Sequence, residues 1–126
     1  MKLLLDTCTL IWLLTGEKPL SARARTAIET GEVSLSAVSA WEIAIKFAKG
    51  QLRLTLPPDR LVPAARAQYG FASLPMDEES ALHVIKLPPL HADPFDRMLV
   101  SQAIVHGLTI VTSDPKIVQY PARTIW

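Results

Sequence analysis

The sequence predicts an α/β fold, namely a three-layer α/β/α sandwich around a central, mainly parallel sheet. Two short apolar runs carry most of this prediction: residues 2–5 (Lys-Leu-Leu-Leu) and residues 108–113 (Leu-Thr-Ile-Val-Thr-Ser), which lead into Asp6 and Asp114. Short runs that are apolar on both faces are typical of parallel strands covered by helices. Between them, strand-like and helix-like segments alternate, which favours the same architecture.

The chain of 126 residues is expected to form one domain, residues 1–126, with room for one sheet flanked by helices. The only cysteine, Cys8, cannot form an internal disulfide, which favours a reducing compartment, the cytoplasm. No apolar run approaches the ~20 residues of a membrane span. The first run meets Asp6 too early for a signal peptide, so no membrane association is expected.

Several kinds of chemistry are disfavoured by the same sequence. The net charge of +1 is not the strongly basic balance of most nucleic-acid binders, although it permits local contacts. The three histidines are scattered, without the spacing of a zinc site, and there is no glycine-rich phosphate loop. Cys8 has no partner of the kind that a thiol nucleophile needs. The acidic residues are therefore the main candidates for function.

The first elements follow from their end signals. Residues 2–5 are the first strand, and a helix through residues 9–14 is closed by Gly16. Ser21 is expected to be the N-cap of a helix that reaches about Thr30, where a glycine ends it.

The middle of the chain repeats this alternation. Residues 33–35 form a short strand, and the Ser-x-x-Glu sequence at 39–42 matches a capping box at the start of a helix that runs to Gly50. Two prolines at 57–58 break the chain before a helix over 59–69.

The last elements include the second strand that ends at an aspartate. Residues 71–76 are expected to be a strand, and acids at 77–79 favour a helix to about Lys86. Asp93 and Pro94 are a good N-cap and first residue for a helix that ends at Gly107. The strand to Thr112, a turn at 113–115 and an extended piece at 123–126 complete the series.

Of the twelve acids, five are not explained as solvated surface groups: Asp6, Glu42, Asp93, Asp96 and Asp114. Asp6 and Asp114 each follow a strand, and ligands of parallel sheets bind beyond the carboxyl ends of the strands. Asp6 also reads as an N-cap, and Asp114 as part of an ordinary Asp-Pro turn. Their shared place at one edge of the sheet favours a site.

Asp96 is the acid that is hardest to explain as a structural residue. Its helix is apolar nearly all round, and Asp96 aligns with Val100 and Ala103 on a buried stripe. The helix dipole explains at most about 1 kcal/mol, whereas burying an ion costs several kcal/mol unless it is paired or bound to a metal. Asp93, three residues earlier, is better explained as the N-cap.

Glu42 has the strongest structural explanation. It could close the capping box with Ser39, and with Lys46 and Lys49 it forms a stripe that is usually solvated. The opposite stripe is expected to be core: Trp41, Ala44, Ile45 and Ala48. Clustered carboxylates repel one another, so a site made from these acids needs a counter-charge, most simply a divalent metal.

Four segments in this order carry a family resemblance: Asp6-Thr7 after a leucine strand, Trp41 to Lys46, His91 to Leu99, and Leu108 to Asp114. Together they resemble the PIN-domain nucleases, specifically the VapC-like toxins of type II toxin–antitoxin pairs. The Trp-Glu-Ile and Asp-Pro-Phe-Asp-Arg blocks are the most specific, and the resemblance extends over essentially the whole chain.

The resemblance implies a Mg²⁺-dependent endoribonuclease, with Mn²⁺ as a possible substitute, that cleaves RNA with metal-activated water. It maps the four acids of the family onto Asp6, Glu42, Asp96 and Asp114 as catalytic and metal-binding residues, with Asp6 and Asp96 as direct ligands. It also implies a cognate antitoxin protein and a homodimer built on the early helices. Candidate phosphate contacts are Lys46, Lys49 and Arg97.

Two other functions stay open. The protein could be a metal-dependent phosphoesterase that acts on DNA or a small phosphate ester, or a non-catalytic scaffold with the same fold. The complete set of four acids argues against the scaffold, because a degenerate copy should have lost at least one.

Overall fold

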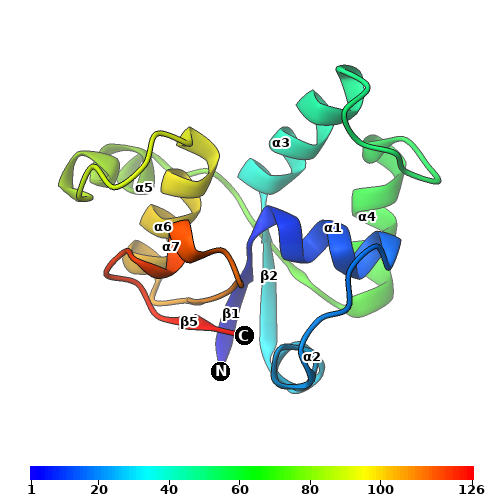
Figure 1. The fold of residues 1–126 in the computed structure, drawn as a ribbon, viewed down its shortest axis with the longest axis horizontal. Helices are drawn as coiled ribbons and strands as arrows, with labels where there is room; N and C mark the ends of the chain where they lie inside the picture. The colour runs from blue at the N-terminus through cyan, green and yellow to red at the C-terminus, as the bar shows by residue number, and fades with distance from the viewer.

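The computed structural model describes residues 1–126 (Figure 1). It contains a five-stranded sheet in the order β3-β2-β1-β4-β5. Every neighbouring pair of strands is parallel. The strands are β1 (Lys2–Leu5), β2 (Glu32–Ser36), β3 (Ala72–Leu74), β4 (Thr109–Val111) and β5 (Thr124–Ile125). The parallel sheet predicted from the apolar runs is therefore confirmed.

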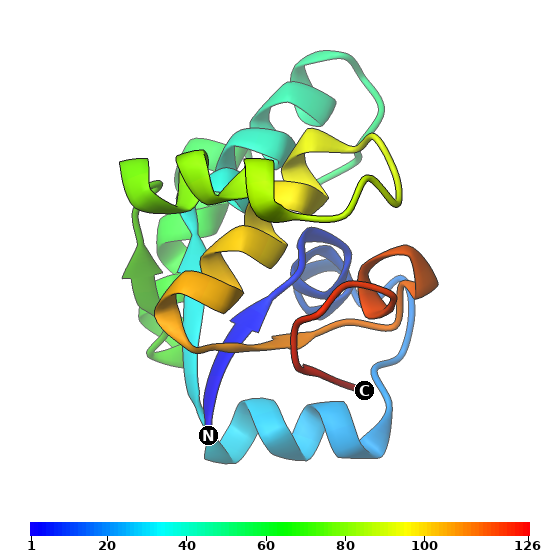
Figure 2. The same cartoon turned by 90° about the vertical axis from the view of Figure 1, so that its left-hand side faces the viewer.

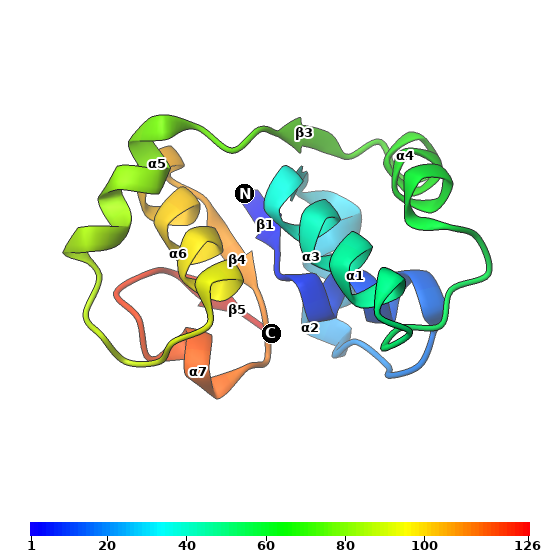
Figure 3. The ribbon, with the colours of Figure 1, turned by 90° about the horizontal axis from the view of Figure 1, so that it is seen from above.

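Seven α-helices surround this sheet. They are α1 (Thr7–Thr15), α2 (Ala22–Thr30), α3 (Ala37–Ala48), α4 (Pro58–Tyr69), α5 (Glu78–His83), α6 (Pro94–His106) and α7 (Pro115–Val118). Seen from above, α1 to α4 lie on one side of the strands and α5 and α6 on the other (Figure 3). None of the helices combines the length and the apolar character that crossing a bilayer requires.

The side chains of β1 show how both faces of the sheet are covered. Leu3 and Leu5 belong to the core on one face, where Ile28 of α2 packs with them. Leu4 belongs to the core on the opposite face with Leu99 of α6. Figure 2 shows α6 lying across this second face. All three leucines of β1 are 0% exposed, so the alternation along the strand places one core on each side of the sheet.

Most of the predicted helix ends are confirmed. The side chain of Ser21 accepts a hydrogen bond from the Ala24 N–H as the N-cap of α2, and Asp93 caps α6 in the same way. Two segments differ in detail. The segment predicted as one helix to Lys86 divides into α5 and a 3₁₀ turn over Val84–Lys86, and the turn after β4 includes the short helix α7.

The predicted start and orientation of α3 are wrong. Ser36 is its N-cap, whereas Ser39 lies inside the helix and its hydroxyl accepts a 3.0 Å hydrogen bond from Thr7 of α1. Because the polar face of α3 turns toward α1, Glu42 is buried and Trp41 is 57% exposed. Neither the capping box nor the solvated stripe describes Glu42. The stripe predicted to be core is not buried, because Trp41, Ala44 and Ala48 are all exposed.

Candidate functional site

Asp6 lies at the carboxyl end of β1 and is also the N-cap of α1. Its Oδ1 accepts a 2.7 Å hydrogen bond from the Thr9 N–H, and its Oδ2 accepts one from the Thr112 hydroxyl. The residue is only 3% exposed. Burial raises the pKa of the Asp6 carboxyl despite these hydrogen bonds, and the nearby charge of Asp114 adds to the rise. The N-cap and the site are therefore two roles that one side chain can fill.

Asp114 reaches the same edge from the neighbouring strand, β4. As the N-cap of α7, its Oδ1 accepts a 2.9 Å hydrogen bond from the Lys116 N–H. The Asp114 N–H donates to the Thr112 hydroxyl oxygen at 3.1 Å. Because the same hydroxyl donates to Asp6, Thr112 joins the two aspartates that the sequence placed at one edge.

Asp96 is in the first turn of α6, directly after its Asp93 cap. The Oδ2 of Asp96 lies 3.1 Å from Nε2 of His91. Burial raises the pKa of the Asp96 carboxyl to about 6; the hydrogen bond from His91 opposes this shift, and the charges of Asp93, Glu42 and Asp114 reinforce it. Asp93 caps α6, Glu42 lies in α3 and Asp114 caps α7. Acids from three elements therefore lie near Asp96.

Glu42 presents its carboxylate from α3. It is 4% exposed, and its Oε2 forms a 2.7 Å ion pair with Lys46 one turn later. Its other oxygen, Oε1, is buried without a hydrogen-bond partner. A buried carboxylate oxygen without a donor is destabilising, so a hydrogen-bond donor or a cation placed next to this atom would stabilise it.

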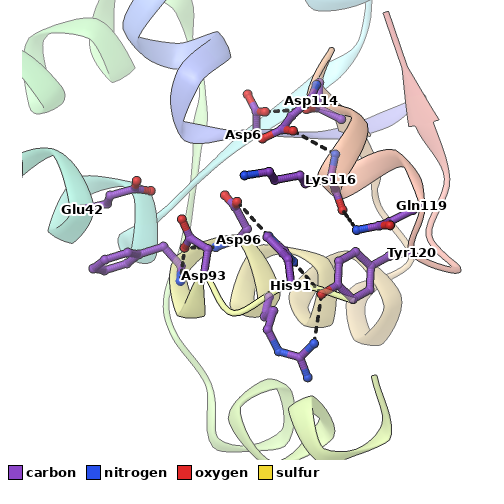
Figure 4. A network of polar contacts seen from close by, with 12 residues as sticks. Asp6, Glu42, His91, Asp93, Asp96, Asp114, Lys116, Gln119 and Tyr120 are labelled. Atoms are coloured by element: carbon purple, nitrogen blue, oxygen red, sulfur yellow. Dashed lines mark hydrogen bonds and ion pairs between the residues drawn. The ribbon is translucent and has the colours of Figure 1, made fainter. Parts of the chain in front are cut away.

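The structure brings the four predicted acids to one region, as Figure 4 shows. Asp6 and Asp114 lie on one side of this region, Asp96 lies opposite them, and Glu42 approaches from α3. Three of these acids also act on the Cys8 thiol. Partial burial raises the pKa of this thiol to about 11, and the negative charges of Asp6, Glu42 and Asp96 add to the rise. The thiolate form of Cys8 is therefore disfavoured. No three acidic, histidine or cysteine side chains are close enough in this arrangement to hold one ion jointly.

The donor set nevertheless fits a hard divalent cation. All four candidate side chains offer carboxylate oxygens, which are the ligands that Mg²⁺ and Mn²⁺ prefer. Negative charge in this region is only partly compensated. Oε1 of Glu42 has no hydrogen-bond donor, and burial and neighbouring acids raise the pKa values of Asp6 and Asp96. A cation in this region would supply that compensation.

Sequence reasoning missed three residues of this region: His91, Lys116 and Tyr120. His91 contacts both Asp96 and Tyr120, and the Lys116 side chain extends into the region between Asp114 and Asp96 in Figure 4. The separation of His91 from Tyr120 by 29 residues leaves no periodic signal. Arg97, a predicted phosphate contact, instead donates to Tyr120 and to the carbonyls of Pro88 and Val84.

The raised pKa of Asp96 predicts how stability depends on pH. Between the usual value of 3.8 and about 6, the folded protein holds a proton on Asp96 that the unfolded chain has lost. The free energy of unfolding of the metal-free protein should therefore fall as pH rises through this window. Urea unfolding of the wild type and of Asp96→Asn, between pH 4.5 and 7.5 in EDTA, measures the effect. Equal slopes for the two proteins would contradict it.

Residues 3–122 match the profile of the PIN domain family. Among solved structures, the DNA-bound VapBC from Salmonella typhimurium aligns with a TM-score of 0.70 and 23% identity, over 99% of this chain and 97% of that chain. VapBC2 from Rickettsia felis, bound to a promoter DNA fragment, aligns with 0.74 and 12%, over 99% and 98%.

FitAcB from Neisseria gonorrhoeae aligns with a TM-score of 0.63 and 19% identity, over 98% of this chain and 96% of that chain. A search of curated protein sequences finds no match. At these identities the solved structures show that the fold is shared, and the profile match extends over nearly all of the sheet and its helices. The chain therefore belongs to the PIN domain family.

Proposed function

We propose that residues 1–126 are a single PIN-like nuclease domain, a Mg²⁺-dependent endoribonuclease that acts in the cytoplasm as the toxin of a toxin–antitoxin pair. Mn²⁺ would substitute for Mg²⁺. The observation that carries this proposal is the gathering of Asp6, Glu42, Asp96 and Asp114 from four elements, with the pKa values of Asp6 and Asp96 raised by burial and by neighbouring acids. PIN domains are generally nucleases, which supports the same activity.

Each acid has a supporting contact that suits the proposed role. Asp6 and Asp96 would be direct ligands, and Glu42 and Asp114 would complete the site or orient the nucleophile. Thr9 and Thr112 hold Asp6, and His91 holds Asp96. When bound, the cation would lower the pKa of a coordinated water and stabilise the charge that develops on the scissile phosphate.

Glu42 keeps Lys46 in its charged form. Burial alone would lower the pKa of Lys46, but the hydrogen bond and charge of Glu42 raise it overall, so the ammonium group persists. This ion pair satisfies one oxygen of Glu42 and leaves the other available.

The partners follow from the same family relation. The similar solved structures are VapBC and FitAB assemblies, which supports a cognate antitoxin protein as the partner of this chain. A homodimer is proposed through the early helices, where Trp12 and Leu13 are only partly buried and pack at the edge of the core.

A cleavage assay distinguishes this function from its alternatives. The purified protein would be incubated with RNA, single-stranded DNA and a generic phosphate ester, each with Mg²⁺ or with EDTA. We expect cleavage of RNA only, and its complete loss in EDTA. Activity on DNA or the ester alone would indicate a different phosphoesterase. No cleavage, together with no heat of Mn²⁺ binding in a calorimetric titration, would indicate a scaffold.

A further inference from the structure

A continuous chain of polar contacts runs from Arg97 through Tyr120 and His91 to Asp96. Figure 4 shows its last three members, Tyr120, His91 and Asp96. Nη1 of Arg97 donates to the Tyr120 hydroxyl at 2.9 Å, that hydroxyl lies 2.7 Å from Nδ1 of His91, and Nε2 of His91 lies 3.1 Å from Oδ2 of Asp96. Tyr120 is buried, and the side chains of His91 and Asp96 are 12% and 16% exposed.

The hydrogen positions along this chain follow from the chemistry of its two ends. A guanidinium can only donate, so the Tyr120 oxygen accepts from Arg97. An ionised carboxylate can only accept, so Nε2 of His91 carries the proton that faces Asp96. A neutral imidazole that is protonated on Nε2 accepts at Nδ1, where the Tyr120 hydroxyl donates. His91 therefore donates to Asp96, which fixes one oxygen of that carboxylate. Oδ1 of Asp96 has no hydrogen bond within the protein.

Arg97 also fixes the loop on which His91 lies. Besides Tyr120, its guanidinium donates to the carbonyls of Pro88 at 2.8 Å and Val84 at 3.4 Å, both on the segment that leads to His91. The arginine thus ties this segment to α6, which carries Asp96. The imidazole is held from both sides, by its loop and by the Tyr120 hydroxyl.

We propose that His91, locked by Tyr120 and Arg97, is a positioning residue that occupies Oδ2 of Asp96 and so presents Oδ1 to the divalent cation. The proposal rests on the function proposed above, because it assigns Asp96 as a metal ligand. Groups that hydrogen-bond to metal ligands commonly alter metal affinity or activity by about 10–100-fold when they are removed.

A second histidine–aspartate pair provides a matched control. Nε2 of His106, at the end of α6, lies 2.8 Å from Oδ1 of Asp77, which caps the start of α5. This pair contains none of the four acids of the site. His91→Ala and His106→Ala each remove one such pair. A merely structural role for His91 would make the two variants alike in metal affinity.

The test measures Mn²⁺ affinity by calorimetry without RNA, and RNA cleavage at low and saturating Mn²⁺. We expect His91→Ala to weaken Mn²⁺ binding by about 10–100-fold, and cleavage to recover at saturating Mn²⁺ with an unchanged KM for RNA. His91→Gln keeps an N–H donor and should restore most of the affinity. Tyr120→Phe, which keeps the buried ring, should weaken binding in the same direction by a smaller factor. His106→Ala should bind as the wild type does.

The tautomer offers a readout without metal. Long-range ¹H–¹⁵N correlation spectra of the metal-free wild type should show His91 protonated on Nε2, and Tyr120→Phe should mix the tautomers. Wild-type Mn²⁺ affinity in both His91→Ala and Tyr120→Phe overturns the proposal, as does an Nδ1-protonated His91. If His91→Ala does not fold, Tyr120→Phe decides. A wild type that neither binds Mn²⁺ nor cleaves RNA overturns the proposed function and this inference together.

Discussion

Asp96→Asn should abolish RNA cleavage and, in the metal-free protein, raise the melting temperature. The carboxylate would be a metal ligand worth several kcal/mol of transition-state stabilisation, and about 3–4 kcal/mol corresponds to a loss of about 10²–10³-fold. The gain in stability has a separate cause. The pKa of Asp96 is raised to about 6 by burial and by neighbouring acids, so its charge opposes folding at neutral pH, and the neutral amide removes that charge. Cleavage rates and thermal unfolding in EDTA at pH 7.5 test both effects.

Asp93→Asn is the matched control for this substitution. Asp93 is three residues away and accepts hydrogen bonds from the N–H groups of Phe95 and Asp96 as the helix cap. Asparagine is an equally good N-cap, so this variant should keep its fold and cleave within about tenfold of the wild type. Full activity of Asp96→Asn would remove Asp96 from the metal site, and a lowered melting temperature would show that its charge is compensated in the metal-free protein.

Asp6→Asn and Asp6→Ala should lose cleavage to the same extent but differ in stability. The carboxylate would be a metal ligand, so either change removes it, with an expected loss of about 10²–10³-fold. The cap on α1 needs only an oxygen that accepts from the Thr9 N–H, and asparagine retains one. Alanine does not, so Asp6→Ala should lose a further ~1 kcal/mol of the free energy of unfolding. Cleavage assays and urea unfolding separate the two roles.

Two outcomes would contradict this division of roles. Cleavage by Asp6→Asn at the wild-type rate would leave Asp6 as a cap alone. Equal unfolding free energies for the two variants would show that the cap contributes nothing measurable.

The sheet and its acidic edge could be predicted from the sequence for a simple reason. β1 and β4 are neighbours and parallel, with Leu5 in register with Val111, so the aspartates that follow them reach the same edge. Apolar runs and chain-end signals are local properties, and the caps at Ser21 and Asp93 were found from them. The positions of Asp6 and Asp114 needed no further information.

The orientation of α3 and the contacts of Asp96 could not be predicted in this way. The apolar stripe of α3 suggested a buried Trp41, but the helix turns Ser39 and Glu42 inward, since Ser39 has a hydrogen-bond partner on α1 that lies 32 residues earlier. His91 and Tyr120 meet only because the loop after the 3₁₀ turn folds back against α7. Such pairings depend on tertiary structure and leave no trace in local spacing.

The hydrogen bond from Thr112 to Asp6 joins residues that are 106 positions apart. A contact of such long range restricts nearly all of the chain between its two ends, so its loop-closure cost is met only when the intervening strands and helices are in place. The carboxylate edge is therefore expected to form together with the global fold and not within any single segment.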